Sequence, residues 1–140
     1  MTKKVIKCGI MPRKAFMERT IAIAKGEYTP KKGEPKVWFE SLQTMAQILS
    51  DENRKLLRTI IREQPESIKA LAEATDRKRN NVSRTLKKMR QYGIVDFKVK
   101  GGVKKPIVNI TDFKLEFGLS SYPPFLFDDE EHSDMKPAIR

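Results

Sequence analysis

The side chains best suited to specific chemistry lie between residues 77 and 91, where arginine, lysine, asparagine and glutamine recur without an acidic residue. Arginine can donate two hydrogen bonds to guanine, and asparagine or glutamine can bind adenine in a similar way. At about 100° per residue, a helix here places Val82, Leu86 and Met89 on one side and the polar residues on the other. A helix face exposed only to water carries polar residues too, but usually with acids among them. The pattern therefore favours a helix that reads DNA bases.

Other elements must position this helix. The expected helices cover about residues 51–63, 67–75 and 80–92, and the expected strands cover 94–100 and 103–110. Ser50 and Ser67 can cap the first two helices, and Gly93 can end the third. Gly101-Gly102 is a signal for a hairpin between the strands. This order predicts a winged helix-turn-helix, in which the second helix of the pair enters the major groove.

Three groups of residues suit three kinds of DNA contact. Residues near the start of the expected helix suit phosphates, those along it suit base edges, and the hairpin lysines suit the backbone or minor groove. The expected DNA-binding residues are Arg77, Lys78, Arg79, Asn80, Asn81, Ser83, Arg84, Lys87, Lys88, Lys98, Lys100, Lys104 and Lys105.

The distribution of charge points to the same partner. The formal net charge is +11, and residues 69–105 hold 12 basic against 3 acidic groups. Residues 106–140 hold 3 basic against 7 acidic groups. A concentrated basic block suits the phosphates of double-stranded DNA, because neutralising them releases counterions.

The N-terminal part of the chain predicts further structure. Residues 3–10 suggest a strand, 12–25 and 41–49 suggest helices, 26–36 a linker, and 113–117 a further strand. The expected fold is α+β and mainly helical. It comprises an N-terminal strand and helix with a linker (1–36), a winged helix-turn-helix domain (37–118) and an acidic, disordered tail (119–140). The two N-terminal helices, with Trp38 and Phe39, either supply dimer contacts or complete a small core.

Few residues suit catalysis or metal binding. The one histidine, His132, lies in the acidic tail, and the one cysteine, Cys8, is expected to be a buried apolar side chain rather than a redox switch. No phosphate-binding glycine loop, secretory signal or membrane-length apolar run is visible. We therefore expect no enzyme activity, no cofactor, no metal and no membrane contact, and a cytoplasmic location.

Short motifs carry a resemblance to a known family. They are Trp38-Phe39-Glu40-Ser41, Leu49-Ser50, Pro65-Glu66-Ser67-Ile68, Leu71-Ala72, Asn81-Val82-Ser83-Arg84-Thr85-Leu86 and Tyr92-Gly93-Ile94-Val95. Over about residues 5–117 the chain resembles prokaryotic winged helix-turn-helix transcriptional regulators related to MarR and ArsR. Members are often encoded beside a small toxin-like protein. The resemblance implies an antitoxin that represses its own operon, with DNA contacts in residues 80–92 and the wing.

Two functions stay open from the sequence. The first is a homodimeric, sequence-specific DNA-binding repressor that recognises a two-fold operator. The second is a protein-binding module that neutralises a basic toxin, with DNA binding secondary. In the second, the tail residues Phe125, Leu126 and Phe127 and the four acids after them would bind the toxin. The alternative for the tail is a solvated segment that limits non-specific association of the basic face.

Overall fold

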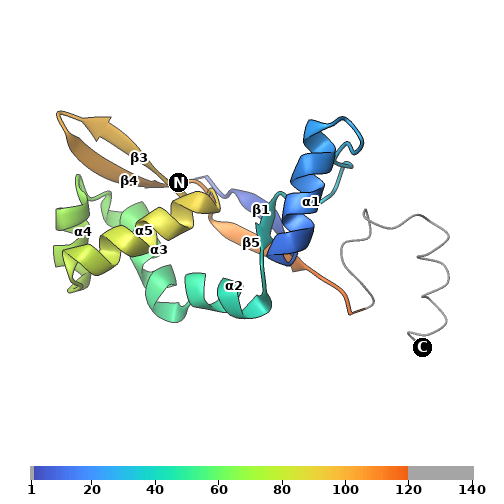
Figure 1. Ribbon diagram of the computed structural model, residues 1–140. Helices are drawn as coiled ribbons and strands as arrows, with labels where there is room; N and C mark the ends of the chain where they lie inside the picture. The colour runs from blue at the N-terminus through green and yellow to red at the C-terminus, as the bar shows by residue number, and fades with distance from the viewer. Residues whose placement is uncertain (1, 120–140) are drawn as a thin grey trace. The chain divides into compact units, whose positions relative to one another are not determined.

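The computed structural model describes residues 2–119, which form five helices and five strands of an α+β fold (Figure 1). These residues divide into two compact units. Unit 1 holds the residues up to Ile6 and Gln43–Phe113, and unit 2 holds Lys7–Leu42 and the residues from Lys114. The expected domain boundaries at residues 36 and 118 stay predictions. The acidic tail and its expected disorder lie outside the described residues.

The helices of unit 1 match the expected ones to within a residue at each end. They are α2 (Leu42–Ile48), α3 (Asp51–Glu63), α4 (Ile68–Thr75) and α5 (Arg79–Gln91). Two predicted caps are confirmed, because Ser50 accepts a hydrogen bond from the Asn53 N–H at 3.3 Å and Ser67 accepts one from the Ala70 N–H at 3.0 Å. Each bond satisfies a backbone donor that the first turn of a helix leaves free.

Gly93 ends α5 in the way expected. Its φ is 74°, its N–H donates to Arg90 O at 2.9 Å, and the Ile94 N–H donates to Met89 O at 3.1 Å. This Schellman arrangement requires the left-handed conformation that glycine adopts without strain. The chain then enters β3 (Val95–Lys100), turns at Gly101 and Gly102, and returns antiparallel as β4 (Val103–Val108). The predicted hairpin is confirmed.

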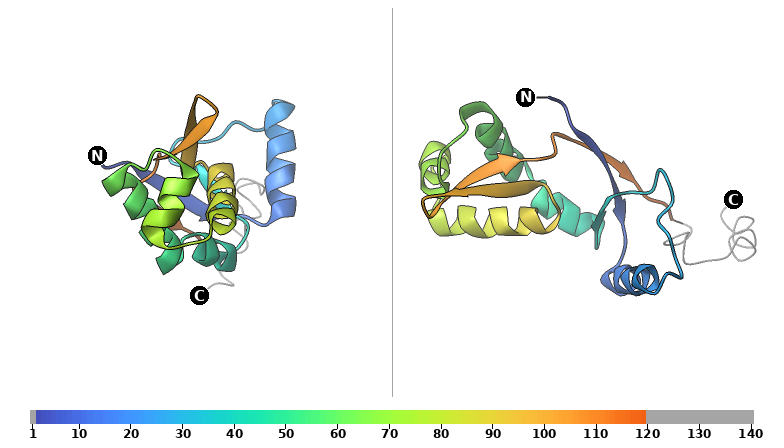
Figure 2. Two further views of the ribbon diagram at one scale, coloured as in Figure 1. Left: turned by 90° about the vertical axis from the view of Figure 1, so that its left-hand side faces the viewer. Right: turned by 90° about the horizontal axis from the view of Figure 1, so that it is seen from above.

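The core of unit 1 lies between the helices and the hairpin. Helix α4 packs against α3 and α5, α3 packs against β4, and α5 packs against β3. Figure 2 shows the hairpin beside α5. The buried apolar side chains of this core include Leu56, Ile60, Leu71, Val82, Leu86, Met89, Ile94 and Val95. Removing their apolar surface from water is the main force that holds α5 in place.

Unit 2 contains a small sheet and one helix. It holds α1 (Arg13–Ala24), β2 (Val37–Phe39) and the greater part of β1 (Val5–Ile10) and β5 (Asp112–Glu116), and β1 lies between β2 and β5 in the sheet. Strands β1 and β2 are parallel, and Cys8 lies opposite Val37. The sequence predicts β1, α1 and β5 but not β2, because three residues without clear alternation become a strand only through pairing.

Trp38 and Phe39 differ in their burial within their own unit. Phe39 is fully buried. Trp38 is half-buried and packs on Gly9, where a Cβ atom would lie 2.5 Å from a carbon of the indole ring. Of the two alternatives for this pair, the core one is confirmed for Phe39. By contrast, helix α1 exposes Phe16 and Thr20 and buries mainly Ala15.

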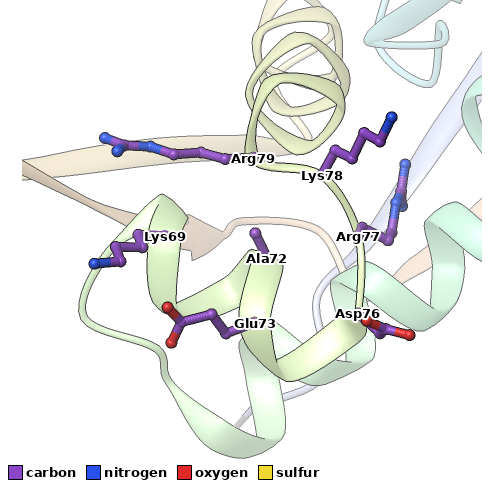
Figure 3. Close-up of a pocket in the computed structure, with 7 residues that line it drawn as sticks. All are labelled: Lys69, Ala72, Glu73, Asp76, Arg77, Lys78 and Arg79. Atoms are coloured by element: carbon purple, nitrogen blue, oxygen red, sulfur yellow. The ribbon is translucent and has the colours of Figure 1, made fainter.

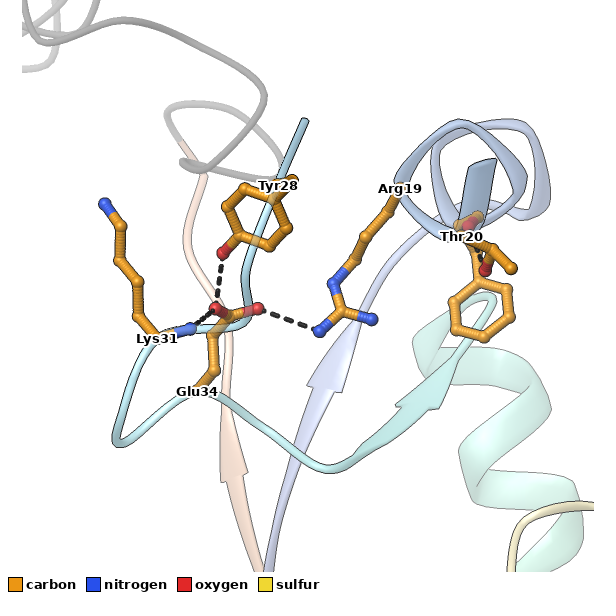
Figure 4. Close-up of polar contacts among 6 residues, drawn as sticks. Arg19, Thr20, Tyr28, Lys31 and Glu34 are labelled. Carbon is orange, nitrogen blue, oxygen red and sulfur yellow. Dashed lines mark hydrogen bonds and ion pairs between the residues drawn. The ribbon is translucent and has the colours of Figure 1, made fainter. Parts of the chain in front are cut away.

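A polar cluster fastens the loop between α1 and β2 (Figure 4). Glu34 accepts hydrogen bonds from Arg19 Nη2 at 3.1 Å, from the Lys31 N–H at 2.6 Å and from the Tyr28 hydroxyl. The Arg19 guanidinium also lies 5.9 Å from the centroid of the Tyr28 ring and 5.5 Å from that of the Trp38 ring. A charge-assisted network of this kind gives order to a loop that contains little regular structure.

Candidate nucleic-acid interface

The buried side of α5 determines which residues it presents to solvent. Val82, Leu86 and Met89 each have no exposed surface, as the helical spacing predicts. We define the α5 polar face as the exposed residues on the other side of the helix, Asn80, Asn81, Arg84, Lys87, Lys88 and Gln91. The predicted division of this helix into an apolar and a polar side is therefore confirmed.

The cations of the α5 polar face are not neutralised within the described part of the chain. There, no carboxylate lies within 4.0 Å of a nitrogen of Arg84, Lys87 or Lys88. Arg84 Nη2 instead donates to Asn81 Oδ1 at 2.8 Å, one turn earlier on the helix. This bond orients the guanidinium and leaves its other donors available to an acceptor outside the protein.

The residues at the start of α5 have different environments. Lys78 and Arg79 are exposed, and Ser83 is half-buried. Arg77 is half-buried, and its guanidinium donates to Asn53 Oδ1 and to Thr85 Oγ1, both at 3.4 Å. Arg77 thus ties the connection between α4 and α5 to the two helices α3 and α5. Its predicted contact with DNA stays a prediction.

A hollow of about 590 Å³ lies between α4 and the start of α5 (Figure 3). It is lined by Lys69, Ala72, Glu73, Asp76, Arg77, Lys78 and Arg79. No acidic residue occupies the first turn of α5, and no side chain caps its free N–H groups. Lysine and arginine side chains beside free helix N–H groups favour an anion.

Lys69 is a further candidate, which the sequence pattern does not single out. It is exposed on the first turn of α4 and lines the hollow with Lys78 and Arg79. The helical spacing does indicate that Lys69 is exposed, because it falls outside the apolar positions Ile68, Leu71 and Ala72 of this helix. What that spacing does not show is that the first turn of α4 lies beside the first turn of α5.

The hairpin divides its lysines between two faces. Lys98 pairs with Lys105 and Lys100 pairs with Val103, so the side chains of Lys98, Lys100 and Lys105 share one face. We call these three residues the hairpin lysine face. Lys104 lies on the opposite face, where its Nζ is 5.7 Å from the centroid of the Phe97 ring. The four lysines expected to form one wing surface are therefore not equivalent.

Like charges stand directly opposite each other in the hairpin. Lys98 and Lys105 are cross-strand partners, an arrangement that costs free energy when no anion is near. Glu66 offsets part of this repulsion, because its Oε1 lies 3.4 Å from Lys105 Nζ. Glu66 is exposed, so it competes weakly with an external anion for this lysine.

Other candidate chemistry is confined to a few residues. Cys8 is fully buried as predicted, and burial raises the pKa of its thiol to about 11. His132 lies outside the described residues. Within residues 2–119, no three His, Cys, Asp or Glu side chains form a group that could hold a metal ion. No helix in that part of the chain is both long and apolar enough to cross a bilayer.

The comparisons with known proteins give one partial match. The family described as HVO_A0114 matches residues 48–115, which run from the end of α2 into β5 and make up just under half of the chain. The chain is thus similar to that family over the segment that contains α3, α4, α5 and the hairpin. No curated protein and no solved structure matches the chain. The relationship to MarR and ArsR regulators stays a prediction.

Proposed function

We propose that this protein is a sequence-specific regulator of transcription that binds double-stranded DNA through a winged helix-turn-helix. Helices α4 and α5 are the helix-turn-helix pair, and the β3–β4 hairpin is the wing. The observation that carries the proposal is the α5 polar face, where arginine, lysine and amide side chains are exposed and no described carboxylate neutralises their charge. The proposed role is binding rather than catalysis.

The chemistry of α5 supports insertion into the major groove. A helix with its side chains is about 10–12 Å wide, which matches the width of about 12 Å of that groove. Arg84 is suited to guanine, because the bond that it donates to Asn81 Oδ1 holds its guanidinium while other donors stay free. Lys87 and Lys88 extend the positive charge along the same helix.

The flanking elements supply phosphate contacts in this proposal. Lys69, Lys78 and Arg79 surround the start of α5, where free N–H groups add a partial positive charge. The hairpin lysine face offers a second position for a phosphate. A phosphate near Lys98 and Lys105 would relieve the repulsion between these opposed lysines, so free energy lost in the hairpin would be regained on binding.

The test measures duplex binding by the full chain. A labelled duplex from the DNA upstream of the protein's own gene is titrated, and an unrelated duplex of equal length serves as the non-specific reference. The substitution Arg84→Ala is expected to weaken specific binding by about 1–3 kcal/mol and to reduce the preference for the upstream duplex. The matched control is Arg58→Ala, which removes one exposed positive charge from α3.

The two variants separate base reading from general charge. If Arg84→Ala and Arg58→Ala weaken binding equally, the assignment of α5 to the groove is wrong. If the wild-type chain binds neither duplex at low salt, the proposed function is wrong. Circular dichroism spectra of both variants confirm that the fold is retained.

Further roles follow from the resemblance rather than from the described contacts. Repression of the protein's own operon and neutralisation of a basic toxin stay predictions. The residues expected to hold a toxin, including Phe125 and Phe127, lie outside the described residues. Capture of the product of a neighbouring gene by the full chain, and its loss from a chain ending at Ser121, would favour this second function.

A further inference from the structure

Helix α1 presents an apolar face that nothing within the described residues covers. Phe16, Met17 and Ile21 are 41%, 54% and 51% exposed. On a helix these three lie around one side, with Thr20 and Ala24 between them, whereas Ala15 faces the core. Scattered apolar residues are normal on a protein surface, but a contiguous set on one helix face marks a contact site.

The first turn of α1 is basic. Arg13 and Lys14 are both exposed, and no acidic residue or side-chain cap is present in this turn. Two cations at the N-terminus of a helix oppose its dipole, which favours anions there. The surface of α1 thus combines an apolar face with a basic end, and it suits an occupant that is apolar in one part and acidic in the next.

The described chain ends close to this surface. The backbone N–H of Lys4 donates to Thr111 Oγ1 at 2.6 Å, and Lys7 Nζ lies 3.4 Å from Glu116 Oε2. The chain therefore leaves β5 at the end of the sheet where β1 leads into α1 (Figure 1). Leu119 follows within three residues and is 96% exposed.

The sequence beyond Leu119 has the matching composition. Phe125, Leu126 and Phe127 are followed directly by Asp128-Asp129-Glu130-Glu131. Only residues 120–124 separate Leu119 from Phe125, and a chain of this length spans at most about 20 Å. Helix α1 is about 18 Å long, so this span is comparable with the length of the helix.

We propose that residues 125–131 bind to α1 of the same chain, with the aromatic pair on Phe16, Met17 and Ile21 and the acids on Arg13 and Lys14. The spacing supports this register. Met17 and Ile21 lie one turn apart on the same side of α1, about 6.0 Å apart along the helix axis, and Phe125 and Phe127 are about 6.6 Å apart in an extended chain. With Phe125 at Ile21, the acids that follow Phe127 reach the first turn of the helix.

Two other occupants fit less well. A second copy of α1 would supply apolar contacts but no cluster of acids for Arg13 and Lys14. The α5 polar face would attract the acids but offers no apolar surface to the aromatic side chains. We therefore infer a contact within one chain, at a surface separate from the proposed DNA interface.

The test places a spin label on the tail and records backbone amide signals of the full chain. The label is attached at Ser133→Cys, since the one native cysteine, Cys8, is buried. We expect broadening of the signals of Phe16, Met17 and Ile21, and loss of that broadening in Phe125→Ser/Phe127→Ser. The Phe125→Ser/Phe127→Ser variant serves as the control, because its tail is attached at the same place. Broadening that remains in this variant comes from the attachment of the tail alone.

A charge exchange tests the acidic part of the contact. Asp128→Lys/Asp129→Lys is expected to reduce the broadening on α1, and adding Arg13→Glu/Lys14→Glu is expected to restore it. The control pair Lys32→Glu/Lys36→Glu changes the same charge at exposed positions outside α1 and should restore nothing.

Each alternative has its own signature. Equal broadening with and without the aromatic pair would overturn the proposal, as would broadening centred on residues 79–91. Contact between chains is tested in a mixture of two kinds of chain. One kind is isotope-enriched and carries no spin label, and the other carries the spin label and is not isotope-enriched. The reference is the chain that carries both the isotope and the spin label. If the amide signals of α1 broaden as strongly in the mixture as in this reference, the contact lies between chains and the proposal is wrong.

Discussion

At the scale of single residues, Tyr28 and Glu34 form a hydrogen-bonded pair whose pKa values shift in opposite directions. Burial, together with the hydrogen bond to Glu34, raises the pKa of Tyr28 from 10.0 to about 12. Burial alone would raise the pKa of Glu34, but hydrogen bonds from Tyr28, the Lys31 N–H and Arg19 outweigh it and lower that pKa. The cluster therefore favours a protonated tyrosine and an ionised glutamate.

We expect unit 2 to lose stability at high pH through Tyr28. Because its folded pKa is raised, its contribution is complete below about pH 10 and is lost as the pH rises toward 12. Tyr28→Phe should remove this part of the alkaline loss, at a cost of about 1 kcal/mol near neutral pH for the missing hydrogen bond. Denaturant unfolding followed by the fluorescence of Trp38, the one tryptophan, measures both effects.

At acidic pH the stability depends on Glu34 instead of Tyr28. The lowered pKa of Glu34 gives stability that is present above its ordinary value of 4.5 and is lost as the pH falls through the lower folded value. Cys8, with a pKa of about 11, contributes alkaline loss in wild type and Tyr28→Phe alike. Identical pH profiles of the two proteins above pH 10 would contradict the role given to Tyr28.

At the scale of elements, α5 depends on its buried stripe for its position. Leu86 is fully buried, so Leu86→Ala should leave a cavity and lower the free energy of unfolding by about 2–5 kcal/mol. Urea unfolding followed by circular dichroism measures this loss. Val99→Ala, which truncates a side chain that is 66% exposed, is the control and should change stability by less than about 0.5 kcal/mol. A loss below about 1 kcal/mol for Leu86→Ala would show that α5 is not held by this contact.

The hairpin should show opposite effects on stability and on binding. Lys98→Thr removes one of two opposed lysines, so stability should stay the same or rise by about 0.2–1 kcal/mol. Duplex binding should weaken for every sequence, and the slope of log affinity against log salt should fall by about one unit. Fluorescence anisotropy at several salt concentrations measures the slope. An unchanged slope would remove Lys98 from the proposed interface.

At the scale of the whole molecule, the proposed function predicts the oligomeric state of the protein. A protein that reads a two-fold operator is expected to be a homodimer bound to half-sites about one helical turn apart. Sedimentation velocity at micromolar concentration should show the dimer, and titration of the duplex should saturate at two chains per site. A monomer at these concentrations together with one chain per duplex would contradict the expectation.

The sequence by itself determined the elements of unit 1 and the two sides of α5. Helical spacing, serine caps and glycine stops act over a few residues, so α3, α4, α5 and the hairpin could be placed to within a residue or two. The buried residues Val82, Leu86 and Met89 follow from the same short-range pattern. The candidate DNA-reading face follows as its complement.

Only the tertiary structure decided which side chains are already engaged and which lie together. It joined Arg77 to Asn53 and Lys105 to Glu66, and it paired β2 with β1. It also left the apolar side of α1 exposed. These outcomes depend on partners that are distant in the sequence, and the free energy of a contact between distant residues is set by the folded chain as a whole. The spacing of residues within one segment therefore cannot predict such contacts.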